Sequence, residues 1–191
     1  MMDAVPLDRQ FVRWGNENPI DIDRAQYLTS HSGNFNWDAL LGLRRVVILA
    51  EAGSGKSTEL DDQAKRMGAQ GRTAFITTLQ KIGQRGGLKS AFGTSEWRRF
   101  EQWQSTAEPC WLFLDSVDEA KRADFTLFDI LTDVADAMDG FSTRIHIVLS
   151  GRVSDWEFKR DLKTLLERIP LPPPDEKLEP VNSDQDLIDA V

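Results

Sequence analysis

The segment Gly53-Ser54-Gly55-Lys56-Ser57-Thr58 carries the clearest chemical pattern in the sequence. Glycines let the backbone curl so that successive N–H groups can point at phosphate oxygens. In the general pattern G-x-x-x-x-G-K-S/T, the lysine reaches the β- and γ-phosphates and the following hydroxyl binds magnesium. Here the first position is Ala50, so the pattern is matched except at that residue. The predicted nucleotide-binding residues are Ala50, Glu51, Ala52, Gly53, Ser54, Gly55, Lys56, Ser57 and Thr58.

An alternative for this segment is a solvent-exposed Gly/Ser turn followed by a serine that caps a helix. The flanking sequence favours the phosphate loop, because the apolar run 46–49 precedes it and a helical pattern over 57–67 follows it. A helix that begins at the end of the loop adds the positive end of its dipole to a phosphate site.

A cluster of carboxylates that could bind a metal ion or act as a general base follows the apolar run 111–114. Asp115 stands directly after that run, and Asp118 and Glu119 come three and four residues later. Ligands bind at the carboxyl ends of strands in parallel sheets. We therefore expect Asp115 to hold Mg²⁺, usually through a water molecule, opposite Ser57. Glu119 is our first choice for the general base that acts on the attacking water, and Asp118 is the second. The alternative is an acidic turn that caps the next helix.

A third candidate, Arg152, comes at the end of the apolar run 145–149. Its guanidinium would lie at the same edge of the sheet as Asp115 and could contact a γ-phosphate. The alternative is a surface arginine paired with Asp155 or Glu157. The predicted catalytic residues are thus Lys56, Asp118, Glu119 and Arg152.

The elements that would position these residues alternate between strands and helices. Strands are predicted at 46–49, 73–78, 111–114 and 145–149. Helices are predicted, in chain order, at 36–43, at 57–67, after a cap at Ser95 (with Trp97, Phe100 and Trp103 on the helix), at 124–138 and at 154–169. The glycines at 83, 86, 87 and 93 predict a loop between the second strand and the third helix. Such alternation indicates an α/β fold with a parallel sheet.

The composition of the chain excludes several classes of site and argues against some classes of partner. The chain has 191 residues, a formal net charge of -8, one cysteine (Cys110) and two histidines (His31 and His146). A single cysteine excludes an intramolecular disulfide and a cysteine-built zinc site, and two histidines are too few for a histidine-rich metal centre. The acidic balance argues against a broad nucleic-acid or anionic-membrane surface. No apolar run approaches the ~20 residues of a membrane helix, and the N-terminus has no secretory pattern. We expect a cytoplasmic protein.

Taken in order, these three motifs resemble the nucleotide-binding domain of STAND NTPases, most closely the NACHT type. The first motif of that family reads Gly-Glu-Ala-Gly-Ser-Gly-Lys-Ser-Thr, and residues 50–58 differ from it only at Ala50. Residues 112–119 follow the second motif, in which an Asp, a small residue and an apolar residue precede Asp-Glu. The third motif, a strand that ends in a polar residue and an arginine, is similar to residues 147–152, but Gly151 departs from it.

The resemblance implies a mostly parallel, five-stranded P-loop NTPase (ASCE-type) fold of three layers, in which the phosphate-loop strand lies between other strands. It also implies a switch that binds ATP or ADP with Mg²⁺, hydrolyses slowly, controls self-association and serves signalling or antiphage defence in bacteria. The expected divisions are an extension over 1–35, the core over 36–170, and a Pro-rich loop with the start of a helical lid over 171–191. On this interpretation the chain is a fragment or a short version of a larger protein.

Guanine-specific P-loop proteins carry an N-K-x-D segment, which this sequence lacks, so ATP is favoured. Phe11, Trp14 or Trp37 could stack near the base, although ordinary core packing is the alternative for each. Two other functions stay open. One is a nucleotide-gated interaction module without turnover. The other is a small-molecule kinase, which would need an arginine-rich lid of which Arg98 and Arg99 are the only sign.

Overall fold

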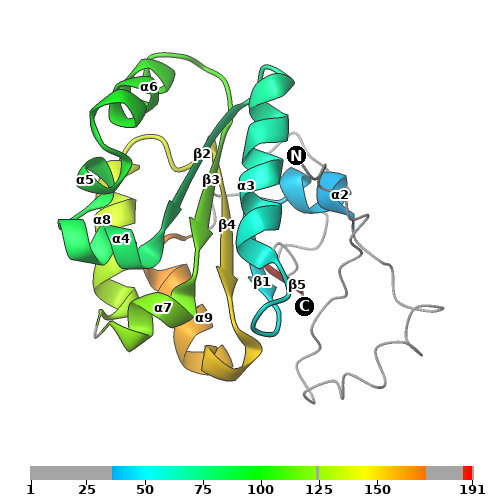
Figure 1. The fold of residues 1–191 in the computed structure, drawn as a ribbon. Helices are drawn as coiled ribbons and strands as arrows, with labels where there is room; N and C mark the ends of the chain where they lie inside the picture. Colours follow the sequence, from blue (N-terminus) through cyan, green and yellow to red (C-terminus); the bar gives the residue numbers. More distant parts are fainter. Residues whose placement is uncertain (1–35, 124, 171–186, 191) are drawn as a thin grey trace, which may run out of the picture.

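The computed structural model describes residues 36–123, 125–170 and 187–190. Its centre is a parallel sheet flanked by helices (Figure 1). The strand order is β2 (Thr73–Thr78), β3 (Cys110–Asp115), β4 (Ile145–Gly151), β1 (Arg45–Leu49) and β5 (Leu187–Ala190). Strands β1 to β4 form the body of the sheet, and the short β5 pairs with the outer edge of β1. The predicted α/β fold with a parallel sheet is confirmed.

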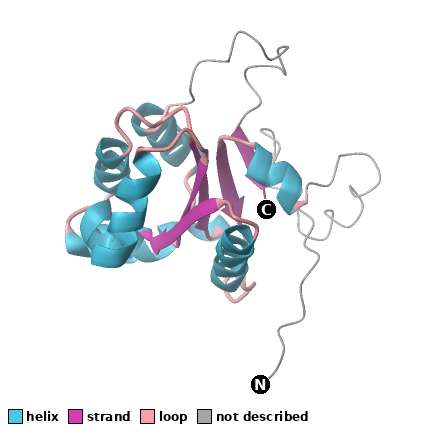
Figure 2. Cartoon of the chain, turned by 90° about the horizontal axis from the view of Figure 1, so that it is seen from above, coloured by secondary structure: helices cyan, strands magenta, loops and turns pink. Residues whose placement is uncertain are grey.

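Helices lie on both faces of this sheet, which gives three layers (Figure 2). One face carries α2 (Trp37–Gly42) and α3 (Lys56–Ala69). The other carries α4 (Leu79–Arg85), α5 (Leu88–Phe92), α6 (Thr94–Gln104), α7 (Val117–Arg122), α8 (Leu127–Ala137) and α9 (Phe158–Arg168), with the short 3-10 helix η1 (Val153–Asp155) before α9.

Strand β1 shows why both faces are covered. All five of its residues are buried, and successive side chains of a strand point to opposite faces. Val46 and Ile48 accordingly pack with α2 and α3, whereas Val47 and Leu49 pack with the helices of the other face. A continuous apolar run is therefore what this position requires.

The glycine-rich stretch after β2 differs from the prediction, because it forms two short helices and not a loop. Thr78 begins α4 by accepting a hydrogen bond from the N–H of Lys81, and Gly86 ends it in a left-handed conformation. Gly83 lies within α4, where a Cβ would meet the ring of Phe125 at 2.6 Å. These glycines serve as helix ends and as a close-packing position, so they did not exclude helix.

Two further differences concern the second half of the chain. The predicted helix over 124–138 is α8 over Leu127–Ala137, and a separate helix, α7, precedes it immediately after the acidic cluster. The expected beginning of a helical lid over the last residues is wrong for 187–190, because these residues form β5. The edge of β1 not used by β4 offers hydrogen-bonding groups to Leu187–Ala190. The predicted extension over 1–35 and the Pro-rich loop over 171–186 lie outside the described residues.

Candidate nucleotide-binding site

The predicted phosphate loop connects β1 to α3 at the carboxyl edge of the sheet. Gly53 and Gly55 both adopt positive φ, 75° and 85°, a conformation that residues with a Cβ rarely adopt. Gly55 is the N-cap of α3, and Lys56 is the first residue of the helix. The two glycines stand where the pattern requires them, and the loop leads directly into the N-terminal turn of a helix of 14 residues. A loop of this shape presents backbone N–H groups and a positive helix end to an anion.

The ammonium group of Lys56 lies inside this loop. Its Nζ donates to the carbonyl oxygens of Ala50 and Glu51 at 2.8 and 2.9 Å, and it is 3.5 Å from Oγ of Ser54. Burial lowers the pKa of Lys56, while the negative charges of Asp118 and Asp115 act in the opposite direction. The lysine is therefore a cation held by backbone carbonyls and close to two carboxylates.

The structure explains why alanine can stand at the first position of the pattern. Ala50 acts through its backbone: its N–H donates to the carbonyl of Gly151 at 3.3 Å, and its own carbonyl accepts from Lys56. Its φ is not positive, since among the described residues other than glycine this applies to Ser116 alone. Neither role needs a glycine.

Asp115 ends β3 with its side chain 5% exposed. The hydroxyl of Ser150, at the end of the neighbouring strand β4, donates to Oδ1 of Asp115. The same Ser150 oxygen accepts the backbone N–H of Ser116 at 3.2 Å. Ser116 itself has a φ of 66°, a strained conformation for a residue with a side chain. The turn that carries the acidic cluster is thus fixed by a hydroxyl from the next strand.

Asp118 and Arg152 form an ion pair across this edge. Nε of Arg152 lies 2.8 Å from Oδ2 of Asp118, which is almost fully buried. Of the alternative partners expected from the sequence, Glu157 pairs with Arg160. Asp155 contacts Arg152 through the backbone, its N–H donating to the Arg152 carbonyl at 3.2 Å. Gly151 allows this approach, because a Cβ there would lie 3.3 Å from Cβ of Val117.

Four predicted site residues are therefore brought together: Lys56, Asp115, Asp118 and Arg152 all interact electrostatically at one edge of the sheet. Glu119 is exposed on α7 beside Asp118. Ser57 and Thr58 are exposed in the first turn of α3. The arrangement of Ser57 opposite Asp115 and the role of Glu119 stay predictions.

The donor set suits Mg²⁺ bound together with a nucleotide. Mg²⁺ is usually held by one or two carboxylates plus phosphate oxygens and water. Within the described part of the chain, no group of three or more His, Cys, Asp or Glu side chains could hold a metal ion. Asp115, at the end of β3, is a carboxylate of the kind that Mg²⁺ uses in such sites.

Three other residues considered from the sequence, Trp37, Cys110 and His146, are buried. Trp37 is 8% exposed, and its indole N–H donates to Glu59 at 2.8 Å, so packing and not base stacking accounts for it. Phe11 and Trp14 lie outside the described residues. Cys110 is buried, which raises the pKa of its thiol. His146 stacks on Trp111 far along β4 from the loop.

The contacts of Ser150 and Lys121 are not predicted from the sequence. The Ser150 hydroxyl donates to Asp115, and the Lys121 ammonium pairs with Asp161 on α9. The sequence carried a signal for Ser150, namely a hydroxyl directly after a buried strand beside the predicted arginine.

Within the described residues, no helix has the length and apolar content needed to cross a membrane.

No protein-family model and no curated protein matches this sequence. Solved structures that this chain resembles in part include a chain of Drosophila ORC bound to poly(dA/dT) DNA and Cdc6, with TM-score 0.42 and 14% identity over 71% of this chain and 26% of that chain. A protein from Neisseria meningitidis has TM-score 0.37 and 14% identity over 92% of this chain and 93% of its own. The cytoplasmic domain of EssC has TM-score 0.38 and 17% identity over 85% of this chain and 35% of its own. Similarities as low as these give no information about function. Any proposal about function must therefore be argued from the residues of the site.

Proposed function

We propose that this chain binds ATP and ADP with Mg²⁺ at the loop over 50–58 and hydrolyses ATP slowly. The observation that carries the proposal is the position of the Lys56 ammonium. It is held by the loop carbonyls of Ala50 and Glu51 at the start of α3 and lies close to Asp115 and Asp118. A cation enclosed by a glycine loop at a helix N-terminus is suited to binding the phosphates of a nucleotide.

Each site residue then has a defined task. The loop N–H groups and Lys56 bind phosphate oxygens, and Ser57 and Asp115 hold the metal ion. Bound Mg²⁺ would neutralise phosphate charge. Glu119, exposed on α7, orients or deprotonates the attacking water, and Arg152 contacts the γ-phosphate. Asp118 positions Arg152 through their ion pair at 2.8 Å.

The biological role we propose is that of a nucleotide switch of the STAND type, with the NACHT branch as the closest resemblance. Support comes from the order of three motifs, residues 50–58, 112–119 and 147–152, on adjacent strand ends. The strand that precedes the loop, β1, lies between β4 and β5, as that resemblance implies. In such a switch the bound nucleotide controls self-association, and signalling or antiphage defence in the cytoplasm is the setting we propose.

The proposed function is tested by Lys56→Ala. We expect the affinity for Mg-ATP to fall by about a hundredfold or more, because a charge-assisted contact to phosphate is lost. Titration calorimetry with Mg-ATP measures it. The matched control is Lys65→Ala, since Lys65 lies on the same helix, is 70% exposed and pairs with Asp61. Normal binding and hydrolysis by Lys56→Ala would overturn the proposal.

Single-turnover hydrolysis separates the slow enzyme from the nucleotide-gated module without turnover. Release of phosphate from stoichiometric ATP supports the enzyme. Tight binding of ATP and ADP with no phosphate release supports the module. Measuring molecular size with ATPγS and with ADP then tests the switch, for which a nucleotide-dependent change in size is expected.

A further inference from the structure

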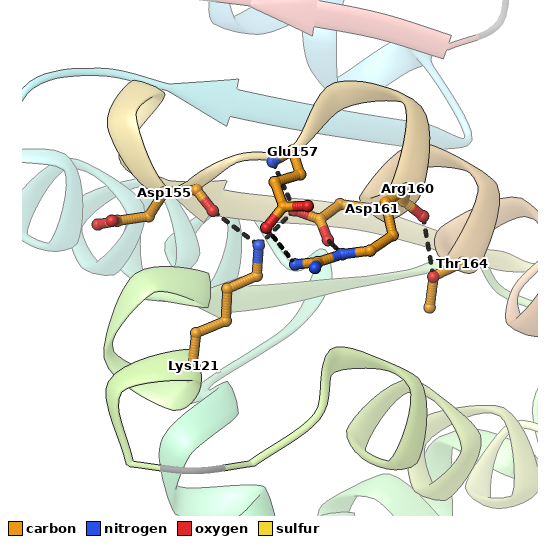
Figure 3. A network of polar contacts seen from close by, with 6 residues as sticks. All are labelled: Lys121, Asp155, Glu157, Arg160, Asp161 and Thr164. Carbon is orange, nitrogen blue, oxygen red and sulfur yellow. Dashed lines mark hydrogen bonds and ion pairs between the residues drawn. The ribbon is translucent and has the colours of Figure 1, made fainter.

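A second ion pair joins the same two segments that carry Asp118 and Arg152. On α7, the ammonium of Lys121 pairs with the carboxylate of Asp161 on α9 and donates to the carbonyl of Asp155 in η1 at 2.7 Å (Figure 3). Asp161 is 2% exposed, so its charge has been removed from water and needs partners. The acceptor Asp155 lies three residues after Arg152.

The two pairs are arranged reciprocally. Asp118 and Lys121 are three residues apart on α7, which places them on the same side of that helix. In one pair, the anion Asp118 lies on α7 and the cation Arg152 directly follows β4. In the other pair, the cation Lys121 lies on α7 and the anion Asp161 lies on α9. Two ion pairs therefore attach the segment from 152 to 161 to α7, and α7 supplies the anion of one pair and the cation of the other.

Asp161 also organises its own segment. Its Oδ2 accepts the backbone N–H of Glu157 at 2.8 Å, and its Oδ1 lies 3.4 Å from Nε of Arg160. Glu157 is the N-cap of α9, the residue directly before the helix. The Asp161 carboxylate therefore contacts both the start of α9 and Lys121 of α7 (Figure 3). At the other end of this stretch, Arg152 pairs with Asp118.

We infer that the Lys121–Asp161 pair is a positioning device for Arg152: it fixes the distance between α7 and the 152–161 segment and so sets where the guanidinium meets the γ-phosphate. This inference rests on the proposed function. Lys121 and Asp161 act through Arg152 and touch no nucleotide, so they are positioning residues. A small displacement of an aligned charged group in such a site has a large effect on the interactions that depend on it.

The test compares two nucleotides that differ in the γ-position. The affinities for ADP and for ATPγS, both with Mg²⁺, are measured by titration calorimetry on the full chain and on Lys121→Met. We expect ADP affinity to stay within about twofold and ATPγS affinity to fall by about tenfold, the effect of one charge-assisted hydrogen bond. Lys121→Arg, which keeps the charge, should restore the preference. Lys163→Met is the control, because Lys163 lies on α9 and is 74% exposed.

The ratio of the two affinities distinguishes positioning from mere support of the fold. A variant that is partly unfolded loses affinity for both nucleotides equally, so an unchanged ratio in Lys121→Met overturns the inference. A second variant, Lys121→Met with Asp161→Asn, avoids leaving a buried charge without its partner, and the same loss of preference is expected in it. If neither variant folds, or if the wild-type chain binds ADP and ATPγS equally, the inference is wrong. A wild-type chain that binds neither nucleotide overturns the proposed function itself.

Discussion

Nε of Arg152 lies 2.8 Å from Oδ2 of Asp118, and this contact joins the residue that follows β4 to the first turn of α7. The Asp118 side chain is 5% exposed, whereas the Arg152 side chain is 32% exposed. The carboxylate therefore depends on the arginine more than the arginine depends on the carboxylate. This difference in burial should be detectable in the free energy of unfolding of variants that lack one partner of the pair.

We predict that Arg152→Ala lowers the free energy of unfolding by about 2 kcal/mol, because a buried carboxylate loses a charged partner that solvent partly screens. Adding Asp118→Asn to that variant should recover at least about half of the loss, since the buried charge is then gone. Urea unfolding of the two single variants and the double variant measures the coupling. Strictly additive effects would show that the pair contributes no coupling energy.

A different prediction concerns Glu119. We expect Glu119→Gln to retain the affinity for Mg-ATP and to lose turnover by roughly a hundredfold or more, the contribution of a general base. The expectation follows from geometry: Asp118 is engaged by Arg152, and its neighbour Glu119 is exposed on α7. Phosphate release under single-turnover conditions, together with calorimetric binding, measures both quantities.

The control for that experiment is Glu167→Gln, which changes a glutamate that is 50% exposed on α9 and should leave turnover unchanged. If Glu119→Gln hydrolyses ATP at the wild-type rate while Asp118→Asn does not, the assignment of the base moves to Asp118. Loss of nucleotide affinity in Glu119→Gln would instead contradict the separation of binding from chemistry.

The site could be predicted from the sequence because each of its parts follows a buried strand. A run such as Val46–Leu49 can be recognised from its apolar side chains alone, and parallel strands bring the residues that follow them to one edge. Lys56, Asp115, Asp118 and Arg152 were therefore placed together without any knowledge of strand order. The contact between Lys121 and Asp161 could not be predicted in this way, because it depends on how two helices pack.

The missed helices have a local cause. In α4 the glycines serve as a helix end and a packing position, and sequence alone does not distinguish these uses from a loop. At the other end, Leu187 and Ile188 fit a helical stripe as well as a strand, because two adjacent apolar residues have no period. The available edge of β1 decides in favour of a strand, and that edge exists only once the sheet has formed.

The position of Gly151 yields a prediction about packing. A Cβ at this residue would lie 3.3 Å from Cβ of Val117, so Val117 would have to move by a few tenths of an ångström, whereas Cδ2 of Leu49, at 3.7 Å, would make an ordinary contact. We predict that Gly151→Ala lowers the free energy of unfolding by about 1 to 2 kcal/mol, as overpacking of a buried position does.

Gly68→Ala is the matched control, because a Cβ on that residue of α3 meets nothing within 4 Å. It should raise the free energy of unfolding by roughly 0.5 to 1 kcal/mol, the helix preference of alanine over glycine. Chemical unfolding of the two variants beside the wild type gives both values. A neutral or stabilising Gly151→Ala would mean that α7 adjusts freely, which would contradict the fixed approach between β4 and α7.

The last prediction concerns pH. His146 is 8% exposed; Nδ1 lies 2.7 Å from the carbonyl of Leu43, and Nε2 lies 3.2 Å from Nη1 of Arg44. Burial, with the positive charges of Arg44, Arg45 and Arg72 acting in the same direction, lowers the pKa of His146 from 6.5 to about 4. The neutral ring therefore belongs to the folded state, with Nδ1–H donating to Leu43 and Nε2 accepting from Arg44.

Between pH 6.5 and 4 the unfolded chain binds a proton at this position that the folded chain excludes, so the free energy of unfolding must fall as the pH falls through that range. The histidine contribution should be as much as ~3 kcal/mol, fully retained above pH 6.5 and lost near pH 4. Urea unfolding at several pH values, on wild type and on His146→Gln, isolates it, because carboxylates titrate alike in both proteins. If the two proteins lose stability in parallel from pH 7 to pH 4.5, the ring is not excluded from protonation in the fold.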